Sequence, residues 1–180
     1  IIGIPKNYWE AKLAFIPDFC AHKKVLEKYC EDVVSNVQTG QGLYLYGDYS
    51  MGKSAGAAIL LKAAAAKRIA GRWVRAKELT GVQIEKRLNP NTGEELFDEF
   101  RECPLLVIDE FQLRETVKYS ESLVEDVIRY RVDKQLSTVV TSNVVLPELK
   151  ANYPAFYAVL QEALYPVHFK GHDFREPKKG

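Results

Sequence analysis

The segment that most constrains this chain is residues 47–54, which fit the phosphate-binding pattern Gly-x-x-x-x-Gly-Lys-Ser/Thr at every position. In such a loop Gly47 and Gly52 allow a tight turn that brings backbone N–H groups to the phosphates. Lys53 can reach the β- and γ-phosphates, and Ser54 can offer its hydroxyl to Mg²⁺. The pattern therefore predicts that the chain binds a nucleoside triphosphate.

The flanks of this loop are those that the motif requires. Residues 42–46 are expected to form a short buried strand, and the Ala- and Leu-rich residues 54–68 a helix whose N-terminus adds partial positive charge. The predicted binding set also includes Asp48, Tyr49, Ser50, Met51 and Ala55. The alternative, a chance glycine-rich turn before a helix, is disfavoured because both flanks match.

Composition narrows the class of protein. The 180 residues suit one α/β domain, and 47% hydrophobic with 27% charged residues is ordinary for such a domain. The net charge of +1 gives no global argument for nucleic-acid binding. The three cysteines lack metal-ligand spacing, and no stretch approaches the roughly 18 apolar residues of a membrane span. We therefore expect reduced thiols, a cytoplasmic location and, because the chain begins at Ile1, a fragment of a longer protein.

Predicted strands alternate with predicted helices, as in a parallel sheet with connecting helices. The strands are expected at residues 42–46, 73–75, 105–108, 138–141 and 167–170. The helices are expected at residues 21–37, 54–68, 77–87, 96–101, 120–132 and 146–164, the last interrupted near Pro154, and a turn at 89–93. The pattern predicts the α/β fold class, with three αβα layers around a five-stranded parallel sheet.

Two acidic residues follow the most apolar predicted strand. Asp109 and Glu110 come after the run Leu-Leu-Val-Ile, which is typical of a strand buried on both faces of a sheet. Parallel sheets bind ligands at the carboxyl ends of their strands, so Asp109 is suited to hold Mg²⁺ directly or through water. Glu110 points differently and can polarise a water for attack on the γ-phosphate. A pair of surface acids at a strand end is the alternative.

Two further polar residues follow later strands. Asn143 comes after Thr141 and Ser142, and its amide can hydrogen-bond the γ-phosphate or the attacking water, although Ser-Asn is also a common turn sequence. Arg175 follows the last predicted strand, and a solvated tail charge is its alternative interpretation.

The order of these motifs resembles the AAA+ ATPases of the DnaC and IstB type, which are helicase loaders and transposon helper ATPases. The resemblance rests on the phosphate loop, the Asp-Glu strand, the Thr-Ser-Asn strand end and the tail sequence Gly-His-Asp-Phe-Arg at 171–175. It implies ATP and Mg²⁺ as cofactors, with Asn143 and Arg175 as the two sensors that contact the phosphates. It also implies an N-terminal segment, residues 1–20, whose Tyr8 and Trp9 flank the adenine. Residues 21–180 would form the AAA+ ATPase domain, without a sizeable C-terminal lid.

The chain departs from this family in one respect. The family carries an arginine finger before the last strand, and this chain has no arginine between Asn143 and Phe174. Arg131, Arg129 and Arg114 are candidates, with Arg131 preferred; a helix-surface charge paired with an acidic neighbour is as good an account of Arg131. Otherwise a partner supplies the arginine, or the protein hydrolyses ATP poorly by itself.

The resemblance also implies partners. Members of the family bind single-stranded DNA through the helical segment after the second strand, which here contains Lys77, Lys86 and Arg87. The densest basic stretch lies between Lys62 and Lys77, and a solvated helix face explains these charges equally well. A replicative DNA helicase or a transposase is the expected client, and homo-oligomerisation on ATP binding is expected.

Several functions fit these residues. The leading hypothesis is an ATPase that loads a helicase in DNA replication. The alternatives are a transposition helper ATPase and an ATP-gated interaction module with slow turnover. A small-molecule P-loop kinase is less favoured, because no Arg-rich lid is visible and Glu110 favours water as the acceptor.

Overall fold

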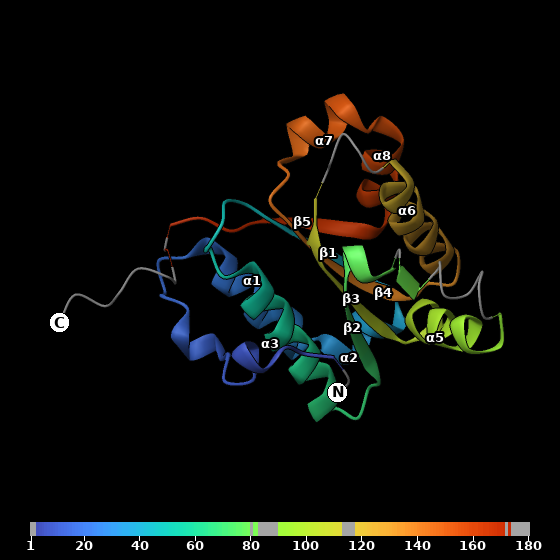
Figure 1. Cartoon of the computed structure of the whole chain (residues 1–180). Coiled ribbons are helices and arrows are strands. Elements are labelled where there is room, and N and C mark those ends of the chain that lie inside the picture. The colour runs from blue at the N-terminus through green and yellow to red at the C-terminus, as the bar shows by residue number, and fades with distance from the viewer. Residues whose placement is uncertain (1–2, 80, 83–89, 113–117, 172, 174–180) are drawn as a thin grey trace.

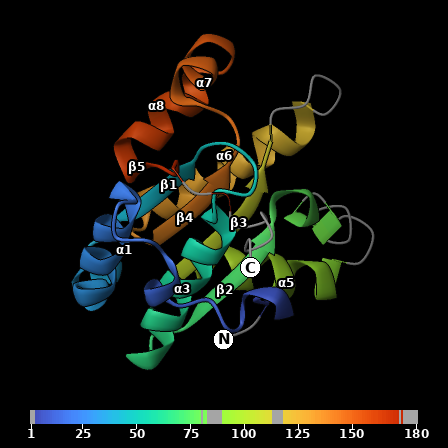
Figure 2. The same cartoon turned by 90° about the vertical axis from the view of Figure 1, so that its left-hand side faces the viewer.

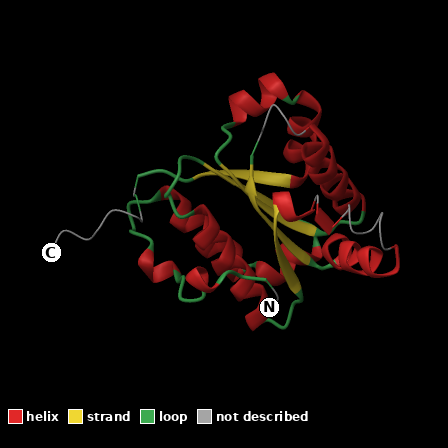
Figure 3. Cartoon of the chain, viewed as in Figure 1, coloured by secondary structure: helices red, strands yellow, loops and turns green. Residues whose placement is uncertain are grey.

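The computed structural model describes residues 3–79, 81–82, 90–112, 118–171 and 173. A central sheet is covered by helices on both of its faces (Figure 3), which is the three-layer arrangement that the sequence predicted. The α/β fold class is therefore confirmed.

All five strands are parallel and lie in the order β2-β3-β4-β1-β5. Their bounds are β1 Gly42–Tyr46, β2 Gly71–Arg75, β3 Leu105–Phe111, β4 Ser137–Ser142 and β5 Leu164–His168. Each predicted strand is present. The last begins three residues before its predicted start at Val167, because Leu164 already pairs with Gly42 of β1.

The helices divide between the two faces of the sheet (Figures 1 and 2). One face is covered by α1 Ala21–Glu31, α2 Val33–Gln38 and α3 Lys53–Ala66. The other is covered by α5 Pro90–Glu102, α6 Lys118–Asp133, α7 Leu146–Asn152 and α8 Pro154–Ala163. The N-terminal segment contains two short 3₁₀ helices, Lys6–Tyr8 and Leu13–Phe15, and crosses the outer side of α3 (Figure 2).

Two predicted helical regions differ from the structure, and a third lies only partly within the described residues. The helix expected at 21–37 is two helices, because Asp32 leaves helical geometry with φ −95° and ψ 17°. The turn expected at 89–93 is wrong from Pro90 onward, since α5 begins there; a proline suits the first helical position, where no N–H donor is needed. In the helix expected at 77–87, the described residues 76–79 and 81–82 are helical.

The core has two parts, one on each face of the sheet. Leu105 and Val107 of β3 face the first helix layer, whereas Leu106 and Ile108 face the second. This alternation explains why the strand is apolar at every position. None of the described helices is both long and apolar enough to cross a membrane.

The strand order determines where the functional residues meet. β4 lies between β1, which leads into the phosphate loop, and β3, which carries Asp109. The carboxyl ends of these parallel strands therefore meet at one edge of the sheet.

Candidate functional site

The phosphate loop connects β1 to α3 through strained backbone. Gly47 and Gly52 have φ of 142° and 83°, and Ser50 has φ of 64°. A side chain on Gly47 would place its Cβ 2.2 Å from the carbonyl oxygen of Phe169, so only glycine fits there. The loop is thus shaped by a close contact with the segment that follows β5.

Lys53 is the first residue of α3 and is only 8% exposed. Its Nζ donates to the carbonyl oxygens of Gly47 at 2.8 Å and Asp48 at 2.5 Å. The ammonium therefore lies over the loop itself, at the N-terminus of α3, where two sources of positive charge coincide.

Asp109 stands at the centre of a buried hydrogen-bond cluster. Its Oδ1 accepts hydrogen bonds from the hydroxyl of Ser54 at 2.8 Å and from the hydroxyl of Thr141 at 2.6 Å. Burial raises the pKa of Asp109 above its ordinary value, and the two hydroxyls act in the opposite direction because they stabilise the carboxylate. The cluster joins the phosphate-loop helix to β3 and β4.

These residues fit a Mg²⁺ ion that is shared with phosphates. Among the described residues, no group of three or more His, Cys, Asp or Glu side chains lies close enough together to hold a metal ion by itself. Mg²⁺ instead takes one or two protein oxygens and completes its shell with phosphate oxygens and water. Ser54 and Asp109 carry oxygens that would suit such an ion, and a cation there would also compensate the buried carboxylate.

Glu110 has an unusual backbone conformation. It lies within β3, where the register against β4 shifts between Ile108 and Phe111, and its φ is 58°. Its N–H donates to the Thr141 hydroxyl at 3.0 Å, and its exposed carboxylate lies 3.6 Å from Nε of Arg75. Asp109 is buried whereas Glu110 is exposed, and strand irregularities of this kind are common next to active sites.

A cavity of about 500 Å³ adjoins these residues. Its phosphate-loop side is lined by Ser50, Gly52, Lys53, Ser54 and Ala55, with Glu110, Thr141 and Asn143 from the neighbouring strands. Apolar and aromatic residues also line the cavity, among them Tyr8, Ile16, Ile59 and Phe169, together with the polar residues Asn7, Glu10 and Lys12. The structure thus brings six of the nine predicted loop residues, with Glu110, Asn143 and Tyr8, around one space. The predicted residues Gly47, Asp48, Met51 and Asp109 are not in its lining.

Trp9 has a different position from Tyr8. It is 57% exposed, is not among the residues that line the cavity, and donates through Nε1 to the carbonyl of Ile4 at 2.9 Å. Its backbone carbonyl accepts a hydrogen bond from Lys62 of α3 at 3.0 Å, and the Tyr8 ring lies 5.9 Å from that of Trp73. These contacts hold the N-terminal segment against α3 and β2.

The structure corrects the role considered for Arg131. This side chain is 0% exposed, so it cannot reach a neighbouring subunit. Its guanidinium donates to the hydroxyl of Thr138 and to the carbonyls of Phe100, Arg101, Cys103 and Ser137. Nor is it a helix-surface charge: it joins the end of α5 to the start of β4. Arg129, by contrast, is exposed and pairs with Glu125 at 2.8 Å.

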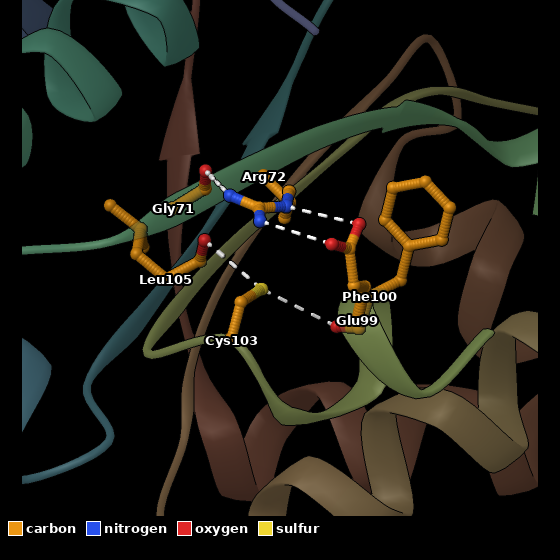
Figure 4. Close-up of polar contacts among 6 residues, drawn as sticks. All are labelled: Gly71, Arg72, Glu99, Phe100, Cys103 and Leu105. Carbon is orange, nitrogen blue, oxygen red and sulfur yellow. Dashed lines mark hydrogen bonds and ion pairs between the residues drawn. The ribbon is translucent and has the colours of Figure 1, made fainter. Parts of the chain in front are cut away.

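Several predicted residues fall outside the described part of the chain: Arg114, Arg175, Lys86 and Arg87. Within it, Lys77 is exposed, but much of the basic stretch before it is already engaged. Arg72 reaches the carboxylate of Glu99 at 3.4 Å (Figure 4), Arg75 pairs with Glu78 and Glu110, and Lys62 holds the N-terminal segment. Half of this basic stretch is therefore engaged, whereas Lys67, Arg68 and Lys77 are exposed.

The three cysteines occupy buried or half-buried positions. Cys20, Cys30 and Cys103 are free thiols, and Cys103 is buried, with its Sγ 3.4 Å from the carbonyls of Phe100 and Leu105 (Figure 4). Burial raises the pKa of the Cys103 thiol, as expected for a packing residue.

Sequence reasoning missed three residues of the site. Thr141 bridges Asp109 and Glu110, and its position directly before Ser142 and Asn143 was an available signal. Arg75 ends the strand next to β3, opposite Asp109, which strand order alone reveals. His22 lines the cavity from α1, and no motif marks it.

Comparison with known proteins supports the fold. The structure is similar to the crystal structure of the DnaC helicase loader, with a TM-score of 0.81, 20% identity, and coverage of 92% of this chain and 100% of that one. A DnaI crystal structure gives a TM-score of 0.77, 21% identity, and coverage of 95% and 94%. A structure of the replication initiator DnaA bound to AMPPCP and single-stranded DNA gives 0.74 at 13% identity, covering 94% of this chain and 51% of that one.

Sequence comparison points in the same direction. The chain is 27% identical over 115 residues to the replicative helicase loader DnaI of Bacillus subtilis (strain 168), a match that covers 63% of this chain and 37% of DnaI. No family model matches the chain. Both comparisons agree with the resemblance that the motifs indicated, and the chain has the fold of the DnaC and DnaI helicase loaders.

Proposed function

We propose that this chain binds ATP with Mg²⁺ and hydrolyses it. The observation that carries the proposal is the cluster in which Ser54, Asp109 and Thr141 are joined by hydrogen bonds of 2.6–2.8 Å, with Glu110 attached to the same hydroxyl. It supports the proposal because Ser54 and Asp109, which we propose as the Mg²⁺-binding pair, and Glu110, which we propose as the base, are linked through these bonds to the helix that follows the phosphate loop.

Each residue has a distinct role in this proposal. Bound Mg²⁺ would neutralise charge on the β- and γ-phosphates. Lys53 binds the same phosphates, Glu110 orients and polarises the attacking water, and Asn143 hydrogen-bonds the γ-phosphate or that water. Arg175 is proposed as the second phosphate sensor, and Tyr8 and Trp9 as part of the segment beside the base. Water as the acceptor favours an ATPase over a small-molecule kinase.

We further propose that this ATPase acts in DNA replication as a helicase loader. The similarity to DnaC and DnaI supports this role, although the match spans only 37% of the length of DnaI. A replicative helicase would be its client, single-stranded DNA a ligand of the region around Lys77, and a homo-oligomer the form that completes the site. A neighbouring copy or the client would then supply the missing finger arginine.

An ATP-gated interaction module with slow turnover is the second candidate. The contact between Arg75 and Glu110 favours it, because the proposed base is already paired with a cation. Turnover measured alone, with single-stranded DNA and with a helicase separates the two: strong stimulation supports the loader ATPase, and an unchanged slow rate supports the module. Replacing the helicase by a transposase tests the transposition alternative in the same assay.

The central test is Glu110→Gln. Removing the base while keeping its shape should lower the rate of phosphate release by about 100-fold or more, with the dissociation constant for ATP nearly unchanged. Glu99→Gln is the matched control, since Glu99 is an exposed glutamate paired with Arg72. Undiminished turnover in the Glu110→Gln protein would remove Glu110 from the mechanism.

A further inference from the structure

The cavity beside the phosphate loop has several apolar and aromatic residues in its lining. Ala55 and Ile59 both line it from α3, and their spacing of four residues places them on one helix face, with Ile59 one turn further from the loop than Ala55. Tyr8, Ile16 and Phe169 also line the cavity. A nucleotide whose phosphates occupy the loop would extend its base toward these apolar residues.

His22 is a polar residue in the lining of this cavity. Its side chain is only 2% exposed, and its ring is stacked on Phe169 with centroids 4.1 Å apart and an angle of 15° between the planes. Phe169 in turn lies against α3, where a Cβ on Gly56 would come within 2.9 Å of its ring. The Phe169 ring therefore lies between α3 and the imidazole, which stacks on it.

Neither ring nitrogen of His22 has a hydrogen-bond partner among the described residues. Buried polar groups are nearly always paired, because an unpaired one loses its bonds to water without replacement. A phenyl ring would provide the same stacking on Phe169 without that loss. The unpaired imidazole therefore indicates a partner that joins the cavity from outside the chain.

We infer that His22 contacts the base of the bound nucleotide by a hydrogen bond to an edge of the adenine ring. The inference rests on the proposed binding of ATP and adds to it a residue that recognises the base. A neutral imidazole has one N–H donor and one acceptor nitrogen, which suit the ring nitrogens and the amino group of adenine respectively. Burial lowers the pKa of His22 to about 4, which keeps the ring neutral near pH 7.

The test compares ATP with inorganic tripolyphosphate, which carries the phosphates and no base. In His22→Phe the dissociation constant for ATP should rise about fivefold to tenfold, the value of one lost hydrogen bond, while that for tripolyphosphate stays the same. The control is Tyr165→Phe, since Tyr165 of β5 is 64% exposed and is not in the cavity lining. This control should bind both ligands as the unmodified protein does.

A second pair of variants covers the case in which His22→Phe does not fold. His22→Asn and His22→Leu both remove the ring, and only asparagine keeps a donor and an acceptor, so the leucine variant should bind ATP several-fold more weakly than the asparagine variant. Equal ATP affinities within this pair, or an equal loss for ATP and tripolyphosphate, would overturn the role of His22. If the unmodified protein binds no ATP, the proposed function itself fails, and this outcome is visible before any variant is made.

Discussion

Nε of Arg75, at the end of β2, lies 3.6 Å from Oε2 of Glu110, at the end of β3. The same arginine lies 3.6 Å from a carboxylate oxygen of Glu78, so Glu110 shares its cation with a second acid. Both side chains of the Arg75–Glu110 pair are partly exposed, which makes the contact weak enough to exchange.

Arg75→Ala should therefore raise the basal rate of ATP hydrolysis, by about twofold to threefold, because Glu110 loses a cation that competes with the attacking water. This factor is what breaking an exposed ion pair is worth. Arg72→Ala is the control, since Arg72 pairs with Glu99 and not with Glu110. Steady-state phosphate release measures both, and a lower rate in Arg75→Ala would mean that the arginine assists catalysis.

Thr141→Val should weaken Mg²⁺-dependent turnover by about tenfold, because Asp109 loses a donor and the N–H of Glu110 loses its acceptor. The Thr141 hydroxyl lowers the pKa of Asp109, so its removal raises that pKa, and half-maximal Mg²⁺ activation should move to higher pH. Thr138→Val, at the start of β4, controls for stability loss alone, since its hydroxyl serves Arg131. An unchanged pH profile would contradict the proposed role of Thr141.

Arg131→Met should lower the free energy of unfolding by about 3 kcal/mol, because it leaves several buried carbonyls without donors. The melting temperature should fall by roughly 6–12 °C for a domain of this size. Arg129→Met should change stability by less than about 1 kcal/mol, as expected for an exposed pair. Calorimetry on both variants tests this, and an Arg131→Met protein of full stability would contradict it.

Stability should depend on pH through His22. Its pKa is about 4 in the folded protein and near its ordinary 6.5 in the unfolded chain. Between these values the unfolded state binds the proton and the folded state does not, so stability falls as the pH drops from 6.5 to 4, by at most about 1.4 kcal/mol per pH unit. Urea unfolding at pH 7.5, 6 and 5 should show a smaller loss in His22→Phe than in the unmodified protein. Parallel losses in the two proteins would contradict a depressed pKa.

Local patterns in the sequence predicted many of the residues of the candidate site. The phosphate loop, the strand before it and the Asp-Glu pair each lie within a few consecutive residues, so their chemistry follows from residue type and spacing. Element boundaries were less secure: Asp32 splits the first helix, and α5 starts at Pro90 inside the expected turn.

The position of Arg131 could not be predicted from such local patterns. Its neighbours in the sequence suggested a surface charge or a finger, yet its partners lie on the end of α5 and the start of β4. Periodicity within α6 does not reveal which carbonyls a neighbouring element presents, and burial of an arginine depends on those carbonyls.

The sequence by itself determined that this chain folds as alternating strands and helices around a phosphate loop, because both features depend on residues that are close together in the sequence. Only the tertiary structure decided that Thr141 would join Asp109 across 32 residues, that Arg75 would face Glu110, and that the ring of His22 would stack on Phe169. The physical reason is the strand order: inserting β4 between β1 and β3 brings distant strand ends to one edge, and no local pattern specifies that insertion.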